Sequence, residues 1–140
     1  FFTGETRSAD PILTSTSSAL KGDDKSVTES MHYIKELGLE TLEAVESGNI
    51  TEVGRLFDAH WSHKKKLARG ITNEKFDKIY EAAKQNGALG GKISGAGGGG
   101  FFTFYVEDNK NNFRKAMSEF GLREMRYRLD FEGSKVIVDF

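Results

Sequence analysis

The chain has 140 residues, of which 20 are Lys or Arg and 21 are Asp or Glu, so its formal net charge is -1. This balance excludes a general electrostatic affinity for nucleic acid, and the lack of cysteine excludes a disulfide framework and thiolate zinc sites. No apolar run approaches the roughly 18 residues of a membrane span, and no signal-peptide pattern opens the chain. The length suits one domain with a real core. Because the first residue is Phe1 rather than Met, we expect a piece of a longer protein.

The first half of the chain is predicted to be mainly helical. Residues 1–3 are typical of the end of a strand. Residues 8–24 mix small polar residues with the only proline and end in a polar loop over residues 21–24. Apolar residues then recur at helical spacing over residues 27–45, and again over residues 51–61. These two stretches predict two consecutive amphipathic helices.

The second half mixes helices and strands. A third helix is predicted to begin after the N-cap Asn73 and to reach residue 87, and a fourth covers residues 113–120. Four strands are predicted in this half, over residues 89–93, 101–106, 125–129 and 136–140, the last two as a hairpin. Together the elements predict an α+β fold, with an antiparallel sheet that resembles the ferredoxin-like fold and helices packed on one side.

The most informative stretch is the glycine loop, Ser94 to Gly100, with five glycines in its last six positions. A flexible linker is rarely held between two strands. Gly95, Gly97 and Gly100 satisfy the dinucleotide pattern G-x-G-x-x-G, but that pattern must open a helix, and an aromatic strand is predicted here. A Walker loop would need Lys-Ser or Lys-Thr, and the protein-kinase motifs do not follow. Two interpretations remain: a cradle of peptide N–H groups for a phosphate or substrate, and a plain hairpin.

Cationic side chains gather near the end of the second predicted helix. His60 and Lys64 lie one helical turn apart on its apolar stripe. This indicates either a cleft at this end of the helix or a packed histidine beside a lysine whose stem lies along the core. Lys64 also opens a basic cluster with Lys65, Lys66 and Arg69, which is either a solvated face or a phosphate-binding site.

Two further cations lie close to the expected cleft. Arg7 follows the first predicted strand, and Lys92 precedes the glycine loop. His60 and His63 form a poor metal pair, because no further ligand motif stands nearby. The sequence contains no recognisable Ser-His-Asp triad, paired-carboxylate site or zinc motif. The residues alone therefore indicate a binding domain without visible catalytic machinery.

Residues 87–101, GALGGKISGAGGGGF, resemble the third motif of the GHMP kinases. This superfamily is named for galactokinase, homoserine kinase, mevalonate kinase and phosphomevalonate kinase. Residues 2–9 and 64–73 are similar to its sugar-kinase branch, and the closest resemblance is to the D-glycero-D-manno-heptose 7-phosphate kinases. The resemblance covers residues 1–140 and implies a GHMP kinase C-terminal domain, with the N-terminal ATP-binding domain absent from this chain.

The resemblance implies a cytoplasmic enzyme that transfers the γ-phosphoryl group of ATP to the anomeric hydroxyl of a heptose 7-phosphate, for lipopolysaccharide or capsule precursors. The catalytic residues and magnesium ligands are expected in the absent domain, so no catalytic or metal-binding residue is assigned in this chain, and the chain alone is predicted to be inactive. The expected partners are ATP with Mg²⁺, a sugar phosphate and the N-terminal domain, with no nucleic acid and no membrane.

Two sets of site residues follow. By resemblance, the glycine loop lines the cleft and supports the nucleotide, giving a cofactor-binding set of Ser94, Gly95, Ala96, Gly97, Gly98, Gly99 and Gly100. From charge and position, we assign to the sugar phosphate a substrate-binding set of Arg7, Lys64, Arg69 and Lys92. Two alternatives stay open: a GHMP kinase that acts on fucose, galactose or mevalonate, and a non-catalytic ferredoxin-like binding module.

Overall fold

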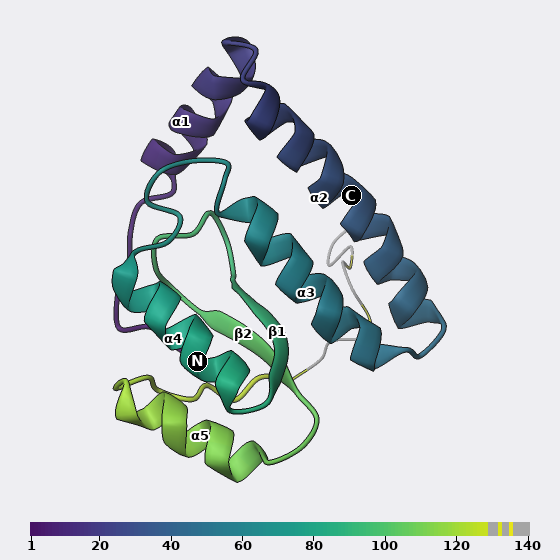
Figure 1. The fold of residues 1–140 in the computed structure, drawn as a ribbon, viewed down its shortest axis with the longest axis vertical. Helices are drawn as coiled ribbons and strands as arrows, with labels where there is room; N and C mark the ends of the chain where they lie inside the picture. The colour runs from purple at the N-terminus through teal and green to yellow at the C-terminus, as the bar shows by residue number, and fades with distance from the viewer. Residues whose placement is uncertain (129–131, 133–134, 136–140) are drawn as a thin grey trace.

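The computed structural model describes residues 1–128, 132 and 135, and among these it contains five helices and a two-stranded sheet. The elements are α1 (Asp10–Lys21), α2 (Lys25–Glu46), α3 (Ile50–Lys64), α4 (Glu74–Gln85), β1 (Ala88–Ile93), β2 (Phe102–Val106) and α5 (Lys110–Glu119). In Figure 1, α1 and α2 form an open V, α3 lies between α2 and the sheet, and α4 and α5 lie together at the far end. The predicted α+β class is confirmed.

The helix α1 occupies residues for which the sequence predicts no helix, so it adds to the predicted elements. Pro11 stands in the first turn of α1, where its missing N–H costs no hydrogen bond. Ile12 is the only residue of α1 that is buried, and the middle of the segment, residues 14–18, consists of Ser and Thr, which have low helix propensity. The remaining helices, α2 to α5, lie where they are predicted.

The start of α4 is fixed by the side chain of Asn73, whose Oδ1 accepts a hydrogen bond from the amide of Phe76 at 2.9 Å. Replacing Asn73 with alanine is expected to lower the free energy of unfolding by about 1 kcal/mol, because the N-cap bond is lost. Urea unfolding of the 140-residue chain measures this change. The matched control is Glu81→Ala, at an exposed position of the same helix. An equal loss in both variants would contradict the capping role.

The sheet is a single antiparallel pair in which Ile93 lies opposite Phe102, so the glycine loop joins the two strands directly. The predicted N-terminal strand is reduced to isolated bridges that Phe2 makes with Phe101 and Arg123. The described sheet is therefore smaller than the sequence predicts.

The predicted strand over residues 125–129 is not formed in its described part, residues 125–128. Alternating apolar residues make a strand only when a neighbouring strand supplies hydrogen bonds, and no described segment pairs with them. Tyr127 is accordingly 82% exposed. The predicted strand over residues 136–140 lies outside the described residues.

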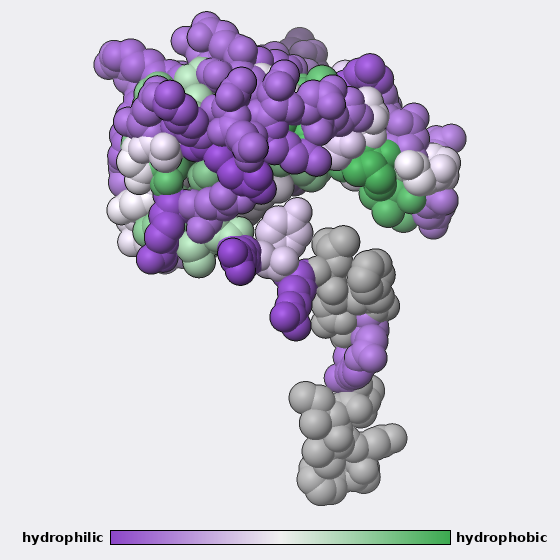
Figure 2. Space-filling model, turned by 90° about the horizontal axis from the view of Figure 1, so that it is seen from below, coloured by the Kyte–Doolittle hydropathy of each residue, from purple (hydrophilic) through white to green (hydrophobic). Residues whose placement is uncertain are grey.

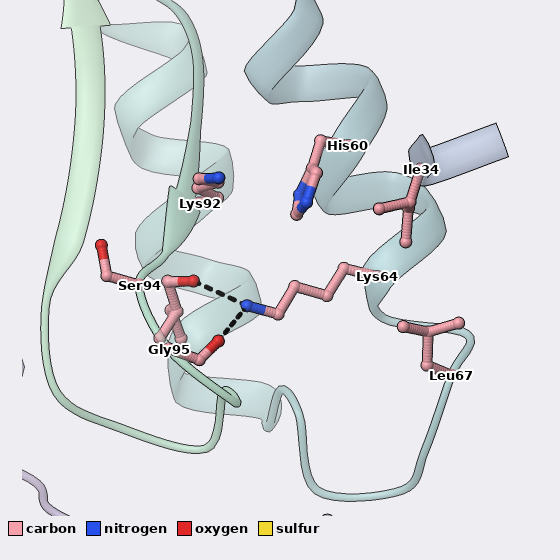
Figure 3. Close-up of a pocket in the computed structure, with 8 residues that line it drawn as sticks. Ile34, His60, Lys64, Leu67, Lys92, Ser94 and Gly95 are labelled. Carbon is pink, nitrogen blue, oxygen red and sulfur yellow. Dashed lines mark hydrogen bonds between the residues drawn. The ribbon is translucent and has the colours of Figure 1, made fainter. Parts of the chain in front are cut away.

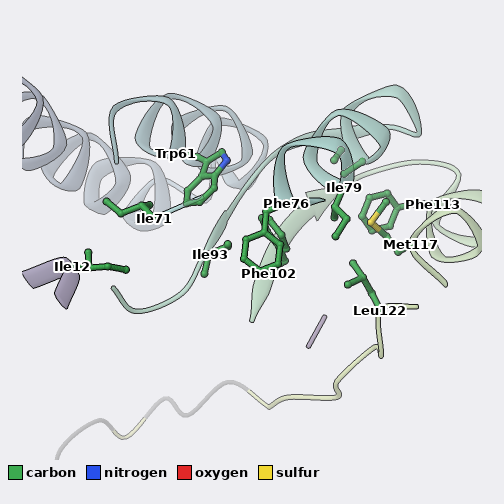
Figure 4. Packing of buried hydrophobic residues seen from close by; sticks show 12 residues of the cluster. Ile12, Trp61, Ile71, Phe76, Ile79, Ile93, Phe102, Phe113, Met117 and Leu122 are labelled. Atoms are coloured by element: carbon green, nitrogen blue, oxygen red, sulfur yellow. The ribbon is translucent and has the colours of Figure 1, made fainter. Parts of the chain in front are cut away.

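The main core lies between the sheet and the helices α3, α4 and α5, with Phe102 near its centre (Figure 4). The ring of Phe102 packs edge-on against Trp61 at 6.0 Å and against Phe76 at 5.8 Å, and it stacks on Phe104 at 5.0 Å. Aromatic side chains bury more apolar area than any others, so this cluster dominates the stabilisation of the fold. A smaller cluster joins α2 to α3 and consists of Leu37, Ala44, Val53 and Leu56.

The helix α3 crosses β1 with almost no space between the two backbones. A Cβ atom on Gly90 of β1 would lie 2.1 Å from the carbonyl oxygen of Gly54 in α3 and 2.6 Å from the amide nitrogen of Asp58. Only glycine permits so close an approach. This crossing fixes the last turns of α3 relative to β1 and to the glycine loop that follows β1.

The surface seen in Figure 2 is mostly hydrophilic. A hydrophobic patch lies at the right-hand edge of that view, at the end of the molecule where α2 runs into α3. Leu39, Leu42, Val45 and Ile50 are the exposed large apolar side chains of this region. No described helix combines the length and the apolar character that crossing a membrane requires.

Candidate functional site

A pocket of about 390 Å³ opens where α3, β1 and the start of the glycine loop meet (Figure 3). The side of α3 facing it carries His60 and Lys64, and β1 supplies Lys92. Its other lining residues are Ile34 of α2, Leu67, Ile93, Ser94 and Gly95. His60 and Lys64 therefore both line a pocket, as the cleft interpretation predicts.

The amine of Lys64 reaches across the pocket to the glycine loop. Its Nζ donates to the carbonyl of Ile93 at 3.0 Å and also to the carbonyl of Gly95, as Figure 3 shows. The amine of Lys92 lies 5.1 Å above the ring of Phe57, which is one turn before His60 on α3. Neither lysine has an ion pair with a described carboxylate, and no carboxylate lines the pocket.

Burial lowers the pKa values of all three basic groups, and the charges of neighbouring lysines add to the shifts of His60 and Lys64. Burial, together with the smaller effect of the charge of Lys92, lowers the pKa of Lys64 to about 8. Burial also lowers the pKa of Lys92. Burial, together with the charges of Lys92 and Lys64, lowers the pKa of His60 to about 4. At neutral pH the pocket therefore holds two ammonium groups and a neutral imidazole, an arrangement suited to an anion.

The glycine loop is folded tightly against two other segments. The amide of Gly98 donates to the carbonyl of Ile71 at 2.8 Å, and the amide of Gly100 donates to the carbonyl of Glu5 at 2.7 Å. A Cβ atom on Gly98 would lie 2.7 Å from the carbonyl oxygen of Gly70. The loop is thus a built turn between two strands, and the linker and dinucleotide-fold interpretations do not apply.

Part of the loop keeps its amides available. The amides of Gly95, Ala96, Gly97 and Gly99 donate to no acceptor among the described residues. Gly97 and Gly99 are buried, whereas Gly95 is exposed, and a Cβ atom there would meet nothing within 4 Å. Gly95 has a positive φ of 79°, which favours glycine, so no side chain covers the backbone at this point. The accessible donors of the loop therefore lie at its start, beside Lys64, and they fit a phosphate oxygen.

The remaining predicted substrate residues lie elsewhere. Arg7 donates to the carbonyl of Gly70 at 3.4 Å and packs against Gly98, so it lies behind the glycine loop. Arg69 is exposed and does not line the pocket. Lys65 turns away to pair with Asp77 at 3.5 Å. The structure thus brings Lys64 and Lys92 together with Ser94 and Gly95, and separates them from Arg7 and Arg69.

Some lining residues could not have been found from the sequence. Ile34 enters the pocket from α2, and Leu67 closes it after the end of α3. Both are ordinary apolar residues with no local signal of a binding role, and only the packing of α2 on α3 places Ile34 there.

Magnesium does not fit this pocket. Mg²⁺ takes oxygen ligands, chiefly carboxylates, and the pocket offers two lysines and no carboxylate. Throughout the described chain, no three His, Asp or Glu side chains come together as metal ligands. Any magnesium ligands of the complete protein are therefore expected outside this pocket.

The chain belongs to a known kinase family. Residues 41–122 match the family described as GHMP kinases C terminal, so the chain is a member of that family. A solved structure of L. major mevalonate kinase in complex with R-mevalonate has the same fold, with a TM-score of 0.75 and 18% identity over 84% of this chain and 36% of that chain.

Three curated relatives are named as kinases of a heptose phosphate or of fucose. D-glycero-alpha-D-manno-heptose 7-phosphate kinase from Campylobacter jejuni is 35% identical over 136 residues, which are 96% of this chain and 38% of that protein. L-fucokinase/L-fucose-1-P guanylyltransferase from Bacteroides fragilis is 30% identical over 85% of this chain and 13% of that protein. The bifunctional fucokinase/GDP-fucose pyrophosphorylase of Arabidopsis thaliana is 29% identical over 92% and 11%. The chain thus spans less than half the length of each relative.

Proposed function

We propose that residues 1–140 form the C-terminal domain of a cytoplasmic, ATP-dependent sugar kinase that phosphorylates the anomeric hydroxyl of D-glycero-D-manno-heptose 7-phosphate. The observation that carries the proposal is a pocket with two lysines and no carboxylate at the start of the glycine loop. The identity of 35% to a heptose 7-phosphate kinase over 96% of the chain supports the choice of acceptor.

The proposed roles follow from the placement of the residues. Phosphoryl transfer depends mainly on positioning and on neutralising the charge of the transferred group. The glycine loop, Ser94 to Gly100, would line the nucleotide side of the cleft and offer its free amides near Gly95 and Ala96. Lys64 and Lys92 would face the acceptor, and Arg7 would brace the loop from behind. An N-terminal domain would supply the magnesium ligands and most contacts to ATP.

The test is a coupled ADP-release assay of the full-length protein with magnesium-ATP. The panel contains D-glycero-D-manno-heptose 7-phosphate, the unphosphorylated heptose, fucose, galactose and mevalonate. We expect turnover with the heptose phosphate, and none by the 140-residue chain alone, which would hold only one side of the cleft. Turnover with another acceptor alone would agree with the kinase family and would refute heptose 7-phosphate as the acceptor.

The second candidate is a kinase of the same family with another acceptor. It is favoured by the two fucokinase relatives, of which one is 30% identical over 121 residues. Fucose carries no phosphate, so this candidate leaves the two-lysine pocket without an anionic acceptor group. A non-catalytic binding module is the remaining alternative. The absence of ADP release with every acceptor in the panel would favour it.

A further inference from the structure

Positive charge in the pocket has no counter-charge within the described chain. Lys64 and Lys92 approach from α3 and β1, and the remaining groups that face them are neutral: Ile34 from α2, Leu67, Ser94 and the imidazole of His60. The nearest carboxylate on the same helix, Asp58, is already engaged, because it accepts from Tyr80 and pairs with Lys84 at 3.3 Å. A ligand is therefore the natural source of the missing negative charge.

The two lysines of the pocket are also held in place by specific contacts, unlike lysines on an open surface. The amine of Lys64 is fixed by the carbonyls of Ile93 and Gly95, and that of Lys92 is held above the ring of Phe57. Apolar side chains close one side, which reduces the screening of charge by water. The volume of about 390 Å³ exceeds that of a phosphate group and leaves room for part of a small molecule attached to it.

We propose that this pocket is the subsite for the phosphate group that the acceptor already carries, a phosphate monoester dianion held by the amines of Lys64 and Lys92. The inference rests on the proposed function and adds to it the group that selects a phosphorylated sugar. Arg69, which lies outside the pocket, has no part in it.

The acceptor is favoured over the nucleotide as the source of this phosphate. The first relative is by name a kinase of a heptose 7-phosphate, whose acceptor brings its own phosphate, whereas the fucokinase relatives are named for a sugar without one. Within the chain, the accessible loop amides near Gly95 lie beside the lysine pocket, so a phosphate held by the loop and a phosphate held by the lysines would be neighbours in the cleft.

Binding of the dianion is expected to draw protons into the pocket above pH 8. Lys64 has a pKa of about 8 in the empty pocket, so part of its amine is neutral at pH 8.5. The groups facing it are the cation Lys92 on β1, the neutral His60 on α3 and two carbonyls, and α2 contributes only Ile34. A bound anion raises the pKa of Lys64, and the amine takes up a proton.

The experiment uses the full-length protein and compares Lys92→Met with the matched control Lys66→Met. Lys66 is an exposed lysine two residues beyond Lys64 and does not line the pocket. We expect Lys92→Met to raise the KM for heptose 7-phosphate about tenfold, the size of one charge-assisted contact. The KM values for ATP and for the unphosphorylated heptose should stay unchanged, and Lys66→Met should alter none of the three.

Calorimetry without ATP supplies a readout that is independent of turnover. Heptose 7-phosphate is titrated at pH 8.5 in two buffers of different ionisation enthalpy, which gives the number of protons taken up. We expect uptake by the wild type and the loss of most of it in Lys64→Met. Lys92→Met serves as the second variant, because Lys64→Met also removes two hydrogen bonds to the loop.

The outcomes separate this inference from the proposed function. Turnover of heptose 7-phosphate with an unchanged KM in Lys92→Met would keep the kinase and overturn the subsite. A rise in the KM for ATP alone would assign the pocket to the nucleotide and also overturn it. Proton-linked binding of heptose 7-phosphate without any turnover would keep the subsite and overturn the kinase.

Discussion

Replacing Gly90 with alanine is expected to lower the free energy of unfolding by about 3 kcal/mol or more. This value is at the upper end of the range for substitutions that add a group to a fully packed site. The new methyl group would lie 2.1 Å from the carbonyl oxygen of Gly54 and 2.6 Å from the amide nitrogen of Asp58. Both are backbone atoms, so no side-chain rotation relieves the contact and α3 must move away from β1. Single domains of this size have total stabilities of about 5–15 kcal/mol. Urea unfolding followed through Trp61, the only tryptophan of the chain, measures the loss.

The matched control is Gly38→Ala in α2. A Cβ atom on Gly38 meets nothing within 4 Å, and its φ is not positive. Alanine is preferred over glycine inside a helix, so this variant should be more stable than the wild type by up to about 1 kcal/mol. If Gly90→Ala unfolds at the same urea concentration as Gly38→Ala, the close crossing of α3 and β1 is wrong.

Replacing Phe102 with alanine is expected to cost about 3–5 kcal/mol, the range for removing a buried phenylalanine ring. Phe102 is only 1% exposed and contacts the rings of Trp61, Phe76 and Phe104. These rings come from α3, α4 and β2, so the cavity would open where the three elements meet. The same urea titration measures the loss, and a shifted emission of Trp61 in the folded variant would report the cavity next to it.

The neighbouring Phe101→Ala provides the control for this prediction. Phe101 is 45% exposed and packs mainly against Phe2, with ring centroids 5.3 Å apart. Its loss should cost about 1 kcal/mol, as for a typical half-exposed position. Equal losses at Phe101 and Phe102 would show that the described packing of β2 on the core is incorrect.

The sequence is sufficient to predict an element when capping or turn residues mark its ends and apolar residues mark the face that packs on the core. Asn73 caps α4 with its side chain, and the aromatic run after the glycine loop forms β2. The helix α1 has no side-chain cap, Ser and Thr fill its middle, and Ile12 is its only buried residue. Its helical state depends on tertiary contacts, which local patterns do not reveal.

The candidate site could be predicted in part for the same reason. His60 and Lys64 interrupt an apolar stripe, and this interruption correctly indicates a cleft. Lys92 is singled out only by its position before the glycine loop. Proximity in sequence misleads for Arg69, because the chain turns after α3 and carries it away from Lys64. The crossing of α3 over β1 decides which cations lie close together. The spacing of residues within α3 or within β1 does not reveal this crossing.

The contact between Gly54 and Gly90 also has an energetic consequence for the pocket. It holds the helix that carries Lys64 close to the strand that carries Lys92, and the charge of Lys92 lowers the pKa of Lys64. The empty folded state is therefore strained electrostatically, and an anion relieves that strain on binding. Stability and affinity are opposed at this site. Evolution toward a more stable empty domain would tend to remove one lysine, and with it the preference for a charged ligand.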